Sequence, residues 1–122
     1  MIFIIDDDKL MVECIARVIK KHSPSISIRC FSDGISAIQE VDEKVKLIFL
    51  DILLDGPDGF TFLNELMSYE DTAKIPIVIV TSLDIKNDLS SYGVVGIMNK
   101  SIMKPDDIKY YLDRYVGETR SS

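Results

Sequence analysis

Short apolar runs alternate along the whole chain with longer stretches that have helical periodicity. The runs at 2–5, 47–50 and 77–80 contain no polar residue, and two further strands are predicted at 26–31 and 94–99. Unbroken apolar runs of this length are typical of strands that are buried on both faces of a parallel sheet. Helices that connect successive strands then cover both faces through right-handed crossovers. The alternation therefore predicts an α/β fold, a single doubly wound sheet of five parallel strands with five helices.

Four of the five predicted helices have a face on which apolar residues recur every three or four positions. The expected inner-face residues are Leu10, Met11, Cys14, Ile15, Val18 and Ile19 in the first helix; Ile35, Ile38 and Val41 in the second; Phe60, Leu63 and Met67 in the third; and Ile108, Leu112, Tyr115 and Val116 in the last. Asp8 and Asp58 are the expected N-caps of the first and third helices. The fourth helix, over 83–92, is predicted to be short, because Asn, Asp and Ser interrupt it and Gly93 ends it.

Length and charge restrict the classes of protein to which the chain can belong. Its 122 residues are enough for one domain with a hydrophobic core, predicted over 1–117, with 118–122 as a frayed tail or the start of a linker. The formal net charge of −6 argues against nucleic-acid binding by this domain, since a phosphate backbone is bound by clustered Lys and Arg. No apolar run approaches the ~20 residues of a membrane span, and no basic leader precedes 2–5, so a cytoplasmic protein without membrane contact is expected. Cys14 and Cys30 are expected to be buried, reduced thiols.

Polar residues that carry chemistry follow four of the predicted strands. They are Asp6, Asp7, Asp51, Thr81, Ser82 and Lys100. Because the carboxyl ends of parallel strands meet at one edge of the sheet, we expect these side chains to lie close together. Two carboxylates about 4 Å apart repel each other by about 4 kcal/mol at an effective dielectric constant of about 20, so a single Lys is too little to keep three of them ionised. A divalent cation is the expected remedy, and a site made only of oxygen ligands favours Mg²⁺.

A Mg²⁺ site with a hydroxyl and a Lys beside a carboxylate fits phosphoryl transfer, in which positioning and charge neutralisation do most of the catalysis. Asp51 is then the expected nucleophile. The acids after the first strand, Asp51 with its loop ending in Asp58-Gly59, Thr81 after the fourth strand and Lys100 after the fifth resemble the receiver domain of two-component response regulators, of the chemotaxis-regulator-like type. The resemblance covers essentially the whole chain and implies the strand order 2-1-3-4-5 of a flavodoxin-like fold.

The resemblance implies a role for each residue around the phosphoryl group. Asp51 would be the phosphoacceptor, and Lys100 would pair with the phosphorylated Asp51. The hydroxyl of Thr81 and the backbone N–H of Ser82 would contact the phosphoryl oxygens.

The resemblance also implies a set of metal ligands. Asp7 would bind Mg²⁺ directly, Asp6 would hold it through water, and Asp51 and the backbone carbonyl of Leu53 would be further ligands. Because three acids run together, a register in which Asp7 and Asp8 form the metal-binding pair remains open. The preferred register leaves Asp8 to cap the helix that follows.

The implied function is a phosphoacceptor switch. It would receive its phosphoryl group from a sensor histidine kinase or a histidine phosphotransfer protein and act on a downstream output domain or protein, without being a turnover enzyme on a third substrate. A receiver-like interaction module that works without phosphorylation is the alternative. An aspartyl-phosphate hydrolase would usually carry a second Asp where Leu53 stands, and the acids at 6–8 would repel the phosphate of a flavin.

Three features depart from the usual receiver pattern. Ile97 stands where an aromatic switch residue is usual, and Ser101 stands where a Pro usually follows the Lys. The interval between Thr81 and Lys100 is also short, in keeping with the weak fourth helix. Together these departures imply an unusual output face.

Two further positions bear on how long a phosphoryl group would last. Leu53 and Leu83 lie two residues after Asp51 and Thr81, where the family has residues that help tune loss of the phosphoryl group. Apolar groups there would order an attacking water poorly. We therefore expect a long-lived phosphorylated state.

Overall fold

A five-stranded parallel sheet forms the centre of the protein, whose computed structural model describes residues 1–53, 59–86 and 88–117. The strands are β1 (Ile2–Ile5), β2 (Ile28–Phe31), β3 (Leu47–Leu50), β4 (Ile77–Thr81) and β5 (Val94–Asn99). They pair in the order β2-β1-β3-β4-β5, and every pairing is parallel. The predicted fold class and strand order are therefore confirmed. The predicted tail at 118–122 and the predicted cap Asp58 lie outside the described residues.

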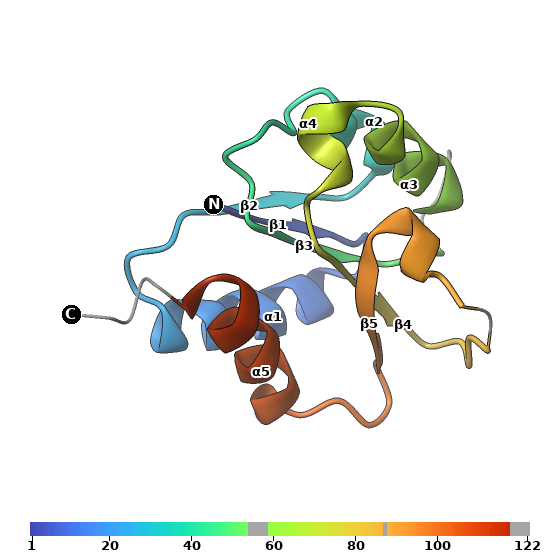
Figure 1. The fold of residues 1–122 in the computed structure, drawn as a ribbon. Helices are drawn as coiled ribbons and strands as arrows, with labels where there is room; N and C mark the ends of the chain where they lie inside the picture. Colours follow the sequence, from blue (N-terminus) through green and yellow to red (C-terminus); the bar gives the residue numbers. More distant parts are fainter. Residues whose placement is uncertain (54–58, 87, 118–122) are drawn as a thin grey trace.

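Helices cover both faces of the sheet (Figure 1). One face carries α1 (Lys9–His22) and α5 (Pro105–Tyr115), and the other carries α2 (Gly34–Ile38), α3 (Gly59–Met67) and α4 (Glu70–Ala73). Each layer encloses its own apolar cluster, and β1, β3 and β4 are buried at every position because both of their faces are covered. None of the helices in the described part of the chain has the length and apolar character needed to cross a membrane.

The connection between β4 and β5 differs from the prediction. The short helix expected over 83–92 is reduced, in the described residues, to a 3-10 turn, η1 (Ser90–Tyr92). Gly93 ends this turn with φ 81°, a left-handed conformation that a residue with a side chain rarely adopts. The structure instead has a short helix, α4, immediately before β4, which the sequence pattern did not indicate.

The inner face of α3 is rotated relative to the prediction. Phe62, Leu63 and Leu66 are buried, whereas Phe60 and Met67 are each 39% exposed. The first residue of the helix sets this rotation, because Gly59 is pressed against the end of β3 and positions three, four and seven residues later share its face. Local apolar spacing alone did not distinguish the two faces.

Both cysteines were predicted to be buried, and this prediction is wrong. Cys14 and Cys30 are free thiols and both are exposed. In α1 the fully buried residues are Ile15 and Ile19, so Cys14 lies beside the packed stripe rather than on it. Leu10, also predicted to face inward, is 74% exposed. Cys30 lies on β2, the edge strand, which is the least buried part of the sheet.

Candidate functional site

The register of the sheet brings two buried carboxylates to one edge. Asp6 follows Ile5 at the end of β1, and Asp51 follows Leu50 at the end of β3. Ile5 and Leu50 are paired across the two strands, and the backbone N–H of Asp51 donates to the carbonyl of Ile5 at 2.9 Å. Asp6 is only 4% exposed and Asp51 only 5%. The strand ends therefore place two acids side by side in a nearly water-free position.

Asp7 adds a third carboxylate to this pair. One carboxylate oxygen from each of Asp6, Asp7 and Asp51 lies within 4.8 Å of the other two. Asp7 is exposed, so the group of three is open to solvent on one side. Asp8 does not belong to this group: it caps α1 by accepting a hydrogen bond from the backbone N–H of Met11 at 3.2 Å, as predicted. This placement agrees with the register in which Asp6 and Asp7 form the pair.

Lys100 reaches into the cluster from the end of β5. Its Nζ lies 3.2 Å from Oδ2 of Asp51 and donates a hydrogen bond to it, and it donates another to Oδ1 of Asp6 at 3.3 Å. Partial burial alone would lower the pKa of Lys100, but the hydrogen bonds to Asp6 and Asp51 and the negative charge of both outweigh it, so the pKa is raised above its usual value. The Lys100 side chain is therefore a permanent cation at this site.

One ammonium group does not satisfy Asp6. Burial raises the pKa of Asp6, and the hydrogen bond from the backbone N–H of Asp8 and the contacts with Lys100 oppose this only in part, while the charge of Asp51 adds to it. Oδ2 of Asp6 is buried and accepts no hydrogen bond from any described residue, although Nζ of Lys100 is 3.0 Å away. A hard divalent cation prefers carboxylate oxygens of this kind, so the residues present fit Mg²⁺.

The loop after β3 is held against the strand end. Oδ1 of Asp51 accepts a hydrogen bond from the backbone N–H of Leu53 at 3.0 Å, which fixes the carboxylate and the backbone of the predicted carbonyl ligand together. Gly59 packs so closely that a Cβ there would lie 2.7 Å from Cα of Ile52, and its N–H donates to the Ile52 carbonyl at 3.2 Å. The structural role of Gly59 was not predicted, although a glycine at the end of a loop was the available signal.

Thr81 lies at the same edge, at the end of β4. It is fully buried, its Oγ1 accepts a hydrogen bond from the backbone N–H of Leu83 at 3.2 Å, and its carbonyl accepts one from the N–H of Lys100 at 2.9 Å. Ser82 is exposed beside it. Leu53 and Leu83 are 50% and 47% exposed, so the loops that follow β3 and β4 each present an apolar side chain to solvent.

An aromatic ring lies against β5, but it comes from α5. A Cβ built on Gly96 would overlap the hydroxyl of Tyr111 and would lie 2.6 Å from its Cε1, so the ring fits only because position 96 is a glycine. Ile97, at the expected switch position, is 38% exposed. The Lys100–Ser101 peptide bond is trans. The sequence pattern does not predict the contact between Tyr111 and Gly96.

Comparisons with known sequences give one consistent family. A family model described as the response regulator receiver domain matches residues 2–113. The protein PilH of Pseudomonas aeruginosa is 27% identical over 88 residues, which are 71% of this chain and 71% of PilH. The DNA-binding dual master transcriptional regulator RpaA of Synechocystis is 31% identical over 114 residues, which are 93% of this chain but 46% of RpaA. The chain thus spans less than half the length of this regulator.

Comparisons with solved structures show the same fold. The receiver domain of the sensor histidine kinase PA1611 from Pseudomonas aeruginosa, which has a magnesium ion coordinated in its active-site cleft, has a TM-score of 0.78 at 21% identity and covers 95% of this chain and 96% of its own. The response regulatory domain of protein mrkE from Klebsiella pneumoniae has a TM-score of 0.77 at 22% identity over 100% of both chains. At these identities the likeness concerns the fold alone.

Proposed function

Because the chain belongs to the family of response regulator receiver domains, we propose that Asp51 accepts a phosphoryl group from the phosphohistidine of a sensor histidine kinase or a histidine phosphotransfer protein. A carboxylate oxygen of Asp51 forms the new bond to phosphorus, the N–P bond of the phosphohistidine breaks, and the imidazole nitrogen keeps the electron pair. The observation that carries the proposal is the buried carboxylate of Asp51, held 3.2 Å from Nζ of Lys100 beside Asp6 and Asp7.

Asp6, Asp7 and Asp51 are the residues that would hold Mg²⁺, with the backbone carbonyl of Leu53 as a further ligand. The ion would neutralise negative charge on the phosphoryl oxygens as they approach the acids. Two features of the site support this assignment: the buried Oδ2 of Asp6 accepts no hydrogen bond from a described residue, and the ligands are all oxygens. The PA1611 receiver domain holds magnesium in its own cleft. Lys100 provides a second positive charge from the end of β5, at the same edge of the sheet.

Lys100, Thr81 and Ser82 would contact the transferred group. Nζ of Lys100 now hydrogen-bonds to the carboxylate of Asp51, so a phosphoryl group on that carboxylate would arrive within its reach. The hydroxyl of Thr81 accepts one hydrogen bond and keeps a proton with which to donate to a phosphoryl oxygen. Because Lys100 and Thr81 are joined by a backbone hydrogen bond, movement of one would be transmitted to the other.

The protein would act as a switch rather than as an enzyme that turns over another substrate. Phosphorylation would change the balance between two conformations, which a downstream output domain or protein would recognise. A second candidate is an interaction module that works without phosphorylation. Two observations favour it: the aliphatic Ile97 at the switch position and the reduction of the predicted fourth helix to η1.

Intact-mass spectrometry after incubation with acetyl phosphate or phosphoramidate and Mg²⁺ separates these two functions. The wild type should gain one phosphoryl mass, and the Asp51→Asn variant and a chelator-treated sample should not. Asp106→Asn is a suitable control, because Asp106 is an exposed acid on α5 whose loss should leave phosphorylation intact. If the folded wild type gains no mass with either donor, the phosphoacceptor proposal is wrong and the interaction module replaces it.

A further inference from the structure

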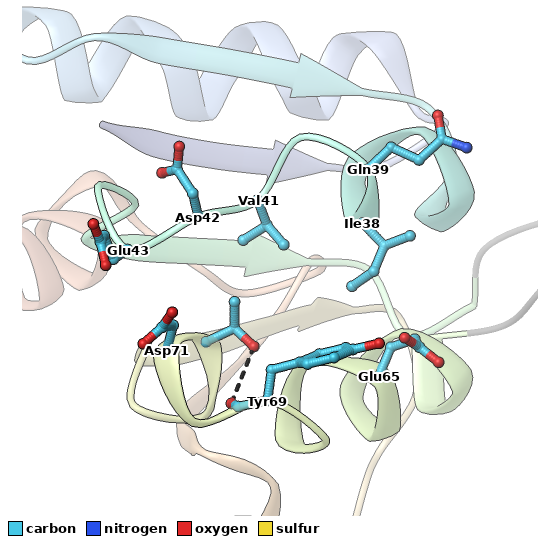
Figure 2. A pocket seen from close by; sticks show the side chains of 9 residues that line it. Ile38, Gln39, Val41, Asp42, Glu43, Glu65, Tyr69 and Asp71 are labelled. Atoms are coloured by element: carbon cyan, nitrogen blue, oxygen red, sulfur yellow. Dashed lines mark hydrogen bonds between the residues drawn. The ribbon is translucent and has the colours of Figure 1, made fainter.

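A groove lies between the end of α2 with the segment 39–43 that follows it and the end of α3 with the start of α4, on the face of the sheet opposite α1 and α5. It has a volume of about 570 Å³, within the range of ~300–1,000 Å³ that is typical of ligand sites. Figure 2 shows the side chains of Ile38 and Val41 pointing into it from above, towards the ring of Tyr69. Tyr69 is 61% exposed, so much of this ring is open to solvent. The floor of the groove is therefore apolar and accessible.

A second, mostly apolar recess of about 110 Å³ lies beside the groove, between α2 and α3. Ile38 and Glu65 line both cavities, and Ile35, which is 50% exposed, lines the recess. Helix α2 ends after only five residues, at Ile38, and the segment 39–43 that follows it lines the groove without forming a helix. A longer second helix would place side chains over this region.

The rim of the groove is acidic. Asp42, Glu43, Glu65 and Asp71 line it, and no Lys, Arg or His is found among the described residues that do so. Asp42 accepts a hydrogen bond from the backbone N–H of Lys44 at 2.9 Å. The carboxylates of Glu43, Glu65 and Asp71 form neither a hydrogen bond nor an ion pair with another residue in the described part of the chain. Three of the four acids on the rim thus have no ion-pair partner in the described part of the chain.

This groove is separate from the carboxylate cluster. Val41 and Asp42 lie before β3, and Tyr69 and Asp71 lie before β4, so the groove opens near the amino ends of these strands. Asp51 and Thr81 lie at the carboxyl ends of the same strands. A partner bound at the groove would leave the cluster accessible to a phosphodonor. Binding at the groove would therefore not depend on phosphorylation of Asp51.

We propose that the groove docks a basic segment of a partner protein, in which an arginine or lysine alternates with apolar residues. The aliphatic stems of its basic side chains would lie on Ile38 and Val41, and their cationic heads would reach Glu43 at one end of the groove and Glu65 at the other (Figure 2). The exposed ring of Tyr69 offers the cation an aromatic face beside these acids. The match of charge is the reason for choosing this occupant: the protein has a net charge of −6, which steers a basic segment towards it.

The test is a titration of the isotopically labelled protein, followed by NMR, with the peptide acetyl-Leu-Arg-Ala-Leu-Arg-amide. The chemical shifts of the backbone amides around Ile38, Glu65 and Tyr69 should change more than those elsewhere in the protein. Glu43→Gln with Glu65→Gln should weaken binding by about fivefold, as expected for two exposed ion pairs. The matched control is Glu13→Gln with Asp106→Asn, which removes the same charge from exposed positions on α1 and α5 and should leave the affinity unchanged.

Two further measurements identify the occupant. Tyr69→Ala should weaken binding of the peptide, which covers the ring, more than binding of spermine, which needs only the charges. The proposal fails if the peptide causes no shifts in the groove at millimolar concentration, or if both double variants bind it equally. It also fails if spermine binds as tightly as the peptide, which would indicate a small polycation, or if sedimentation shows a dimer that Glu43→Gln with Glu65→Gln dissociates, which would indicate a second copy.

Discussion

The ammonium of Lys100 lies 3.0 Å from Oδ2 of Asp6, and yet this buried oxygen accepts no hydrogen bond from the residues that the structure describes. Lys100 directs its hydrogen bonds to Oδ1 of Asp6 and to Oδ2 of Asp51 instead. A carboxylate that is taken out of water needs several partners to remain ionised at no cost, and one cation shared between two acids does not provide them. The site is therefore under electrostatic strain that a metal ion, a charge-removing substitution or a change of pH should relieve.

Binding of Mg²⁺ should raise the melting temperature of the protein. A tenfold excess over the dissociation constant stabilises the folded state by about 1.4 kcal/mol, which amounts to several degrees for a domain of this size. Asp7→Asn should abolish this rise, because it removes one of the three carboxylates that would hold the ion, the one that is open to solvent. Asp8→Asn is the control: Asn also caps helices well, and Asp8 lies outside the group of three acids. If Asp8→Asn rather than Asp7→Asn abolishes the effect, the register of the metal site is shifted by one residue.

Asp6→Asn should stabilise the metal-free protein at neutral pH. Burial raises the pKa of Asp6 in the folded state above its value of 3.8 in the unfolded chain, so the ionised carboxylate disfavours folding. This penalty is fully present above the folded-state pKa and disappears as the pH falls through and below 3.8, where both states bind the proton.

Urea denaturation in a chelating buffer tests whether the ionised carboxylate of Asp6 destabilises the folded state. The urea midpoint of Asp6→Asn should exceed that of the wild type at pH 7, and the two midpoints should converge as the solution is acidified below the unfolded-state pKa of 3.8. An equal gain from Glu43→Gln, an exposed acid that precedes β3 and so lies at the amino end of the strands, would show that loss of any negative charge suffices.

Lys100→Met should destabilise the metal-free protein by about 2 kcal/mol, because it leaves Asp6 and Asp51 buried without a cation. Because the pKa of Lys100 is raised in the folded state, this stabilisation is fully present below pH 10.5, the pKa in the unfolded chain. It is lost only as the pH rises through the higher pKa of the folded state. Lys109→Met is the control, since its exposed contact with Asp106 at 3.8 Å should contribute less than about 0.5 kcal/mol. Equal unfolding free energies for the two variants would contradict the role given to Lys100.

The strands and the acidic edge were predictable because their signal is local and strong. The runs that end at Ile5 and Leu50 are apolar at every position, which only a strand covered on both faces explains, and parallel pairing then brings Asp6 and Asp51 together. Lys100 joins them because β5 ends in register with Thr81. These contacts follow from topology and need no knowledge of side-chain packing.

Other features depend on contacts between distant segments. The rotation of α3 is set by Gly59 against Ile52, and apolar residues at 60 and 67 fit a helical pattern as well as those at 62 and 66. The ring of Tyr111 lies on β5 because Gly96 leaves room for it, which no local pattern around either residue indicates. Cys14 is exposed because it lies one position from the packed stripe of α1.

Gly96→Ala should displace Tyr111 from β5 and destabilise the protein by about 1 kcal/mol, because the new methyl group and the ring cannot occupy the same space. Burial raises the pKa of Tyr111. The negative charges of Tyr110 and Tyr115, once these ionise, and the carboxylate of Asp107 raise it further. Displacement into water should lower this pKa. NMR of the labelled tyrosine ring carbons, titrated above pH 9, measures the pKa of Tyr111 in the wild type and in Gly96→Ala. A pKa for Tyr111 that is the same in both folded proteins would contradict the packing of the ring against Gly96.

Leu53→Asn combined with Leu83→Glu should shorten the lifetime of the phosphorylated protein. The backbone N–H of Leu53 donates to Oδ1 of Asp51 and that of Leu83 donates to Oγ1 of Thr81, so both side chains start from loops that are fixed to the site. Both side chains are about half exposed, at 50% and 47%, and apolar groups there give a water no partner. Polar groups at the same positions would hold a water near phosphorus, where it would form the new P–O bond as the bond to Asp51 breaks.

The expected change is an increase of about tenfold in the rate of hydrolysis, equivalent to about 1.4 kcal/mol of activation free energy. It is measured by phosphorylating with phosphoramidate, removing the donor and following the phosphoryl mass with time. Leu10→Asn with Ile102→Glu is the matched control, because both side chains are 74% exposed and neither adjoins Asp51 or Thr81 in the chain. An unchanged half-life in the Leu53 and Leu83 variant, or an equal shortening in the control, would mean that water reaches the phosphoryl group by a route that these two leucines do not govern.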